Sequence, residues 1–339
     1  SSKKLKISII GGFHWYDVLL LDANYDTVAY IPEVHFKPSF TKFKNLKSID
    51  LKSPVYYLRS EGVGFSLSNF NFDLSSSFLT FFSEAILIHK ISVHDGELLL
   101  VNEGETKSFR SIEIIADNIR LGHQYNFFLR SLSWVNCENK KQLIKSTFFE
   151  LKKDSFFASE FQWEYMNSSI HLDLFMERDS SVFKIKNLVF NARDMQDFIL
   201  SWPSHSLINL SSDIYFKGDS IFVDKIVLNT QNNTFFSGFL SLNNWRNPSD
   251  QYGHIVCDSL YIAAKEWEWI ETCFQSSHEW SSLGGIQSSF IAKGTFSDFD
   301  IDLSLHSNIG DLKSSLNFTG FDSKTIPEYN GSLILSDFN

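Results

Sequence analysis

The acidic side chains with the shortest spacing are the first candidates for acid–base catalysis. Asp298, Asp300 and Asp302 alternate along one predicted strand, and Glu266 and Glu268 lie on either side of a tryptophan. A glycoside hydrolase needs two carboxylates held at a fixed separation across a cleft, and neither spacing defines such a pair. Aspartates that alternate with apolar residues are typical of the solvated face of an antiparallel sheet. We therefore interpret them as surface residues.

Other catalytic and metal-binding patterns do not occur in the sequence. Serine is abundant, but there is no GxSxG nucleophile elbow, and Gly62-Val-Gly64 lacks the third glycine of a nucleotide-binding loop. Cys137, Cys257 and Cys273 are odd in number and widely spaced, which indicates neither a disulfide framework nor a CxxC site. We predict a protein that is not an enzyme and holds no metal or cofactor. None of the histidines that we considered as metal ligands lies in an HExxH motif or in a His/Cys pair. They are His89, His94, His171, His254, His278 and His306.

Five tryptophans form an ambiguous group. Such residues can stack on sugar rings or line the edges of an apolar groove. Aromatic residues supply much of the buried area of a protein, so we favour the interpretation that they cap sheet ends and fill helix–sheet junctions. They are Trp163, Trp245, Trp267, Trp269 and Trp280.

The composition indicates a large folded chain of 339 residues, 43% of them hydrophobic, with a formal net charge of −10. This length allows two domains or one large β domain. The acidic balance argues against nucleic acid as a partner, because phosphate binding needs clustered Lys and Arg. No apolar run of about 18 residues and no signal peptide occurs. The chain starts at Ser1 without a methionine and stops at Asn339 straight after a strand-like run, so we expect a segment of a longer protein.

Short segments of alternating apolar residues fill the sequence and predict β-strands. Residues 207–217 have the period of two that is typical of a strand with one apolar face. The alternation resumes at Ile221 and Val223 and changes parity at Ile226, which predicts a β-bulge near Asp224-Lys225.

Turn residues and a few helical stretches separate the strands. Turns are expected at His94-Asp95-Gly96, Asn102-Glu103-Gly104, Lys217-Gly218-Asp219, Lys293-Gly294 and Tyr329-Asn330-Gly331. Such close spacing leaves little room for crossover helices, so we predict a mainly antiparallel sheet. Short helices, with apolar residues three and four apart, are expected at 77–84, 192–202 and 263–274.

Part of the sequence repeats. The segment from Ala192 aligns with the segment from Ala263, and the segment from Ser212 aligns with the segment from Ser288. Such copies are expected to stack and bury their faces against their neighbours. We expect an N-terminal β segment over 1–180 and a repeated β region over 181–339, with approximate copies at 192–262 and 263–339.

Many antiparallel strands with one apolar face must hide that face in a sandwich, a closed barrel or an open trough. The alternation by itself favours an ordinary sandwich core. An open trough would instead expose a long groove suited to acyl chains, since each CH₂ moved out of water contributes about 0.8 kcal/mol. Roughly 18–22 strands at ~4.8 Å spacing would make a trough on the order of 90–105 Å long.

Particular stretches carry a resemblance to a known family. Residues 88–100 resemble the strand–Asp-Gly–strand hairpin of AsmA-like proteins. Residues 283–300, 310–320 and 326–335 resemble the repeat units of the TamB-like members of that family, the translocation and assembly module proteins of diderm bacteria, in the form found in Bacteroidetes. The resemblance is one of pattern and order, not of an active-site motif, and it is most specific over 180–339.

The resemblance implies an AsmA-like fold: a long, twisted antiparallel sheet curled into an open trough, the β-taco, with an apolar inner face and a few short helices. It also implies a periplasmic protein, anchored in the inner membrane by a segment outside this chain, that bridges the inner and outer membranes. Proteins of this family are associated with phospholipid transport between those membranes and with outer-membrane protein assembly or secretion beside an Omp85-type barrel protein.

On these grounds we expect phospholipid acyl chains to lie passively against the apolar face. One alternative is a protein-interaction scaffold whose edge strands pair with barrel strands by β-augmentation, without lipid conduction. A lesser alternative is a carbohydrate-binding β protein. The residues predicted to face the groove are Ile208, Leu210, Ile214, Phe216, Ile226, Leu228, Leu240, Leu242, Ile301, Leu303 and Leu305.

Overall fold

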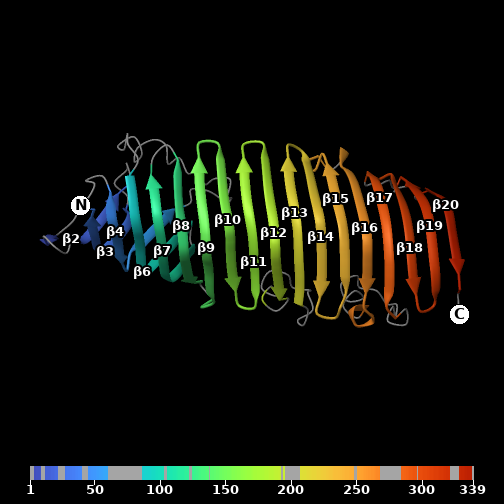
Figure 1. Cartoon of the computed structure of the whole chain (residues 1–339), viewed down its shortest axis with the longest axis horizontal. Coiled ribbons are helices and arrows are strands. Elements are labelled where there is room, and N and C mark those ends of the chain that lie inside the picture. The colour runs from blue at the N-terminus through green and yellow to red at the C-terminus, as the bar shows by residue number, and fades with distance from the viewer. Residues whose placement is uncertain are drawn as a thin grey trace. The chain divides into compact units, whose positions relative to one another are not determined.

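The computed structural model describes residues 4–8, 12–21, 27–39, 45–59, 86–102, 105–121, 124–136, 138–191, 194, 207–247, 250–267, 284–295, 297–320 and 328–337. Nearly all of these residues lie in twenty β-strands, β1 to β20 (Figure 1), beside a short 3-10 helix, η4 (Ala264–Glu266). The chain divides into two compact units, Ser1–Met166 (unit 1) and Asn167–Asn339 (unit 2). The prediction of a mainly β, mainly antiparallel fold is confirmed.

Unit 1 contains the first ten strands. Most neighbours pair antiparallel, but β4 and β5 follow one another along β6 and both pair with it in parallel. At the junction, Ser53 N donates to His94 O (2.8 Å) and Glu97 N donates to the carbonyl of the buried Pro54 (2.8 Å). The strands are β1 (Lys4–Ser8), β2 (Gly12–Leu21), β3 (Thr27–Pro38), β4 (Leu46–Lys52), β5 (Val55–Arg59), β6 (Ile86–Asn102), β7 (Glu105–Leu121), β8 (Tyr125–Val135), β9 (Lys141–Lys152) and β10 (Ser155–Tyr165).

Two clusters of buried apolar residues form the core of unit 1. One joins Ile88, Ala116, Ile119 and Leu129, with further aliphatic and aromatic side chains packed around it. The other joins Val18, Ile31 and Val34 on β2 and β3. Unit 1 therefore has the conventional arrangement of a β domain, in which apolar side chains pack against each other away from water.

Unit 2 contains the other ten strands, and each pairs antiparallel with its neighbours in sequence (Figure 1). Its ladder therefore uses only connections between sequential strands. The strands are β11 (Ser168–Glu177), β12 (Ser180–Asn191), β13 (Leu207–Lys217), β14 (Ser220–Thr230), β15 (Phe235–Asn243), β16 (Tyr252–Ile262), β17 (Ile286–Thr295), β18 (Phe299–Ser307), β19 (Gly310–Thr319) and β20 (Glu328–Ser336).

β-bulges recur in the first part of unit 2. The register shifts once in each pairing from β11–β12 to β16–β17, whereas the pairings from β17 to β20 run without a shift. Between β14 and β15 the shift falls at Val223/Ile226, where Lys225 has a positive φ of 51°. The predicted bulge near Asp224-Lys225 is therefore confirmed, and such bulges bend the strands that carry them.

The turn predictions had mixed outcomes. Lys217-Gly218-Asp219 does connect two strands, but Asp95-Gly96 and Tyr329-Asn330-Gly331 lie inside β6 and β20, and Lys293-Gly294 lies inside β17. Asp95 has a φ of 51° and lies at a register shift between β6 and β7. An Asp-Gly pair suits such a bulge as well as it suits a turn. At Gly331 an added Cβ would lie 2.0 Å from Ser315 O, so this glycine permits close approach of β19.

The predicted helices lie largely outside the described residues. This holds for 77–84 and, apart from Asp194, for 192–202, whereas the segment predicted at 263–274 starts with η4. Of the predicted copies, 192–262 contains β13 to β16 and 263–339 contains β17 to β20. The division into compact units falls after Met166, upstream of the boundary expected at 180/181.

Candidate functional site: an apolar sheet face in unit 2

The strand register of unit 2 brings the predicted groove residues onto one face of its sheet, here called the apolar face. Residues paired directly across antiparallel strands point to the same side. One row of such pairs joins Leu240, Ile255, Ala292, Ile301 and Leu316 across β15 to β19. The same relation, strand by strand, places all eleven predicted residues on this face: Ile208, Leu210, Ile214, Phe216, Ile226, Leu228, Leu240, Leu242, Ile301, Leu303 and Leu305.

These side chains are half-buried. All eleven have intermediate exposure, because each packs on its cross-strand neighbours but keeps part of its surface accessible. On β18 the half-buried Leu303 and Leu305 alternate with the exposed Asp302, Ser304 and His306. On β18 this alternation is that of a strand with one apolar and one solvated side. On β14 and β17 the opposite face also carries apolar side chains, Phe222 (42% exposed) and Ile291 (43%).

No second sheet covers the apolar face among the described residues of unit 2. All ten strands belong to one ladder of sequential neighbours, and the other described element, η4, has three residues. A β-sandwich would need a facing sheet at about 10 Å. Within the described part of unit 2, the apolar face is thus the uncovered side of a single layer.

Small buried residues interrupt the apolar face. Ser212 Oγ donates to Asp224 O (3.1 Å) and Ser288 Oγ donates to Ser304 O (3.0 Å), so both hydroxyls are satisfied within the sheet. An added Cβ at Gly238 would lie 2.1 Å from the Val256 carbonyl oxygen. These residues let neighbouring strands approach closely while adding little polarity to the surface.

Cys257 is the one cysteine among the described residues, and it lies on the apolar face. It pairs with Gly238 and Phe290, is free and is 2% exposed. Burial raises the pKa of its thiol, with a smaller contribution from Asp258. A buried thiol that stays protonated is a poor nucleophile, so Cys257 contributes packing here.

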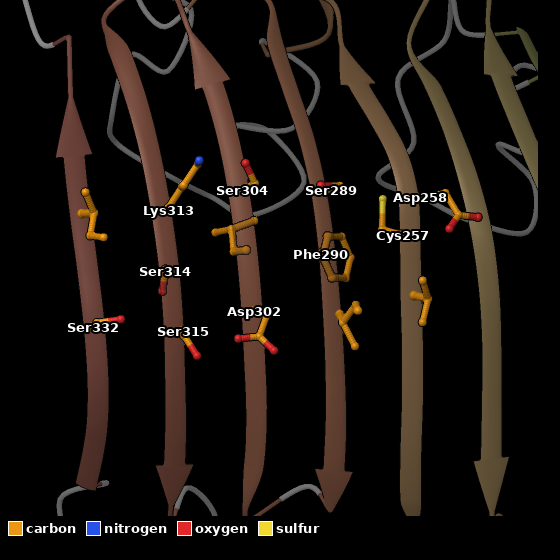
Figure 2. Close-up of a pocket in the computed structure, with 14 residues that line it drawn as sticks. Cys257, Asp258, Ser289, Phe290, Asp302, Ser304, Lys313, Ser314, Ser315 and Ser332 are labelled. Carbon is orange, nitrogen blue, oxygen red and sulfur yellow. The ribbon is translucent and has the colours of Figure 1, made fainter.

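The opposite face carries a depression of about 500 Å³ (Figure 2), bordered by apolar side chains, among them Val256, Ile291 and Ile334, as well as by polar ones. Serines from β17, β18, β19 and β20 border it together with Lys313. Asp258 and Asp302 also border it, but they come from β16 and β18, two strand spacings or about 9.6 Å apart. That separation lies at or beyond the upper end for a glycoside hydrolase pair.

Two of the acidic residues considered on β18 and just before it accept structural hydrogen bonds. Asp300 accepts from Asn317 Nδ2 (2.8 Å), and Asp298 accepts from Gly320 N (3.1 Å). Glu268 lies outside the described residues.

Two buried carboxylates were not recognised from the sequence as structural anchors. Asp194, 1% exposed, accepts from Ser168 Oγ (2.7 Å) and Asn167 N (2.8 Å). Glu266, 3% exposed, accepts from Thr230 Oγ1 (2.6 Å). Each follows the last strand before a long connection and ties that connection back to an earlier strand. The sequence carried one signal for these anchors. Each of the two aligned segments, from Ala192 and from Ala263, contains an acidic residue, and the two positions differ by one in the alignment.

The histidines lie apart along the chain. His94 Nδ1 lies 3.0 Å from Glu113 Oε2, and His254 packs edge-on against Phe239 with ring centroids 5.1 Å apart. His306 makes a close contact with Asp311. Among the described residues, no group of three or more His, Cys, Asp or Glu side chains is arranged to hold a metal ion.

Three of the five tryptophans considered from the sequence are among the described residues. Trp163 stacks on Tyr165 and donates to Gln142 Oε1 (3.2 Å). Trp267 is buried and donates to Gly284 O (2.6 Å). Trp245 follows β15, whereas the other two candidates lie outside the described residues.

Comparison with known proteins adds no identification. No protein family, curated protein or solved structure matches the chain. A search of the described helices finds none with the length and apolar character of a membrane span.

Proposed function

We propose that unit 2 is a lipid-binding segment whose apolar face accommodates phospholipid acyl chains during transport between two membranes. The observation that carries this proposal is the continuity of the apolar face across hydrogen-bonded strands that no described second layer covers. An extended, uncovered apolar surface normally marks an interaction site. Acyl chains fit it best, because they are apolar along their whole length and need no specific polar partner.

The mechanism is passive. A chain moving over the apolar face exchanges contacts with one row of Leu, Ile and Phe side chains for contacts with the next. Each CH₂ kept out of water contributes about 0.8 kcal/mol, and successive rows offer similar surroundings. The free energy of the bound chain therefore changes little along the face, which favours sliding over tight binding at one position.

The cellular setting of the proposal comes from the resemblance to AsmA-like and TamB-like proteins. By that resemblance the chain would lie in the periplasm of a diderm bacterium, with membrane attachment through a segment outside this chain. An Omp85-type barrel protein would be its partner at the outer membrane, and outer-membrane protein assembly would be the associated process.

Photocrosslinking to lipid tests the proposal directly. A photoreactive amino acid at Leu303 or Leu305 should crosslink to phospholipid, and one at Ser304 should not, because Ser304 lies on the opposite face. In a second test, Leu303→Asp with Leu305→Asp should abolish crosslinking from Ile301, since charge on the face opposes burial of acyl chains.

The matched control is Ser304→Asp with His306→Asp, which adds two carboxylates to the same strand on its exposed face. Circular dichroism should show unchanged β content in both double variants. Equal crosslinking from Leu303 and Ser304, or crosslinking unaffected by the two leucine substitutions, would contradict the lipid proposal.

A second candidate function is a scaffold for β-strands, and β20 favours it. Among the described residues, β20 pairs with β19 alone, and all nine of its own residues are exposed, including Tyr329 (76%) and Leu333 (56%). An exposed apolar edge strand is a template for pairing with another strand. Capture of an alternating apolar–polar peptide at β20, without lipid in the purified protein, would favour this function over lipid transport.

A further inference from the structure

We infer that the hairpin turns at one end of the strands in unit 2 form a binding site for the zwitterionic head group of a phospholipid. This inference rests on the proposed function, because it places the head group of a lipid whose chains lie on the apolar face. The site is a cavity of about 440 Å³ bounded by the end of β11, the start of β12, the end of β13 with the turn that follows it, and the segment after β15.

Successive hairpins are joined into a continuous rim at this end. The turn at Gly218 donates its N–H to Asp179 O in the preceding hairpin (3.2 Å). Trp245 N in the next connection donates to Asp219 O (3.2 Å). These backbone hydrogen bonds fix the turns relative to one another, so that the side chains they carry border one cavity.

The floor of the cavity belongs to the apolar face. Phe183 and Phe216 both border it, and their rings pack edge to face with centroids 5.7 Å apart. Phe183 pairs with Ile214 and Phe216 pairs with Ile221, both on the apolar face. An acyl chain lying on that face can therefore continue to the floor of this cavity without crossing a polar barrier.

Cationic and acidic groups surround the apolar floor. Arg178 and Arg246 border the cavity, and the Arg246 guanidinium lies 3.4 Å from Asp219 Oδ1 and 5.3 Å from the Trp245 ring. Arg178 has no ion pair within the described residues. Guanidinium groups bind phosphate oxygens through charge-assisted hydrogen bonds, so these two arginines are the phosphate ligands in the inferred site.

Two carboxylates complete the site. Glu177 and Asp179 also border the cavity. With Asp219, which pairs with Arg246, three carboxylates accompany the two guanidinium groups, so the site suits a phosphate joined to an ammonium group better than a net anionic head group.

Calorimetric titration with soluble short-chain lipids tests this inference on the whole chain. Dihexanoyl-phosphatidylethanolamine should bind, and Arg178→Gln with Arg246→Gln should weaken it about a hundredfold, because two charge-assisted contacts of about tenfold each are lost. Dihexanoylglycerol, which lacks the phosphate, should bind both forms equally. The matched control is Lys293→Gln with Lys313→Gln, which removes the same charge from exposed positions on the opposite face and should leave all titrations unchanged.

Several results would overturn the inference. Unchanged phosphatidylethanolamine affinity in the arginine variant would do so, as would equal affinity for dihexanoyl-phosphatidylglycerol, which has no ammonium group. Inorganic phosphate binding as tightly as the lipid would assign the site to the free anion instead. If the head-group inference fails alone, Leu303→Asp with Leu305→Asp still weakens dihexanoylglycerol binding; if the proposed function fails, that variant has no effect.

Discussion

Unit 1 and unit 2 are built from the same kind of antiparallel strand, but they treat their apolar side chains differently. In unit 1, Ile88 is 4% exposed and lies in a cluster of buried residues joined by further apolar neighbours. In unit 2, Leu303 and the ten other residues predicted to face the groove are only half-buried. The described residues that are fully buried in unit 2 are mostly small or belong to the anchors of long connections.

The difference indicates where each unit obtains its stability. Unit 1 gains from packing in a conventional core, whereas unit 2 depends more on its ladder and on the fit between adjacent strands. A surface that is not committed to a core remains available for a ligand. The comparison therefore links the weaker burial in unit 2 to its proposed function.

The largest expected effect is a contrast between core and face. Ile88→Ala should lower the free energy of unfolding of unit 1 by about 3 kcal/mol, because it leaves a cavity among buried residues. Leu303→Ala should lower that of unit 2 by about 1 kcal/mol, since its side chain is already partly hydrated. Hydrogen exchange of β6–β7 and of β18–β19 amides measures the two units separately. Equal losses of unfolding free energy in the two variants would mean that the apolar face is packed like a core.

A smaller effect is expected from glycines within unit 2. Gly238→Ala should destabilise unit 2 by about 2 kcal/mol, because the new Cβ would lie 2.1 Å from Val256 O and force the strands apart. Gly253→Ala is the matched control, since the nearest atoms to its Cβ lie 4.0 Å away. Urea denaturation followed by hydrogen exchange of β15–β16 distinguishes them. Similar behaviour of the two variants would contradict the dependence of unit 2 on close strand approach.

The smallest expected effect is electrostatic and lies in unit 1. Lys52 Nζ, 3.0 Å from Glu33 Oε2, lowers the pKa of the Glu33 carboxyl below its ordinary value of 4.5. A lowered folded-state pKa contributes stability that is fully present above pH 4.5 and is lost as the pH falls below it. Lys52→Gln should therefore reduce the loss of stability between neutral and acidic pH.

Thermal melts of unit 1 across pH 3 to 7 provide the measurement, and the shift in melting temperature should be small because Lys52 is mostly exposed (57%). If the melting temperature of Lys52→Gln depends on pH as that of the wild type does, the Lys52–Glu33 pair contributes nothing to the stability of unit 1. The contrast between the units would then rest on packing alone.

Much of the fold of unit 2 follows from local sequence patterns. Alternation fixed the face of Leu303 and Leu305 because side chains on a strand alternate strictly. The parity change at Ile226 located a bulge because an extra residue moves all later side chains to the other face. Both inferences need only residues that are close in sequence.

Other features depend on long-range pairing, which local patterns do not report. The parallel pairing of β4 and β5 with β6 joins segments separated by many residues, and their alternation is the same as in antiparallel strands. The rim cavity likewise brings Arg178 and Arg246 together from hairpins that are far apart in the sequence. Trp245 was noted from its type alone, and its neighbours could be identified only once the register was known.

The nearest-neighbour connectivity of unit 2 has an evolutionary consequence. Since no strand needs a distant partner, duplication of one hairpin would insert two strands and lengthen the sheet by about 9.6 Å without rearranging the others. Deletion would shorten it by the same step. The length of such a sheet can therefore change by whole hairpins, while the chemistry of its surface stays constant.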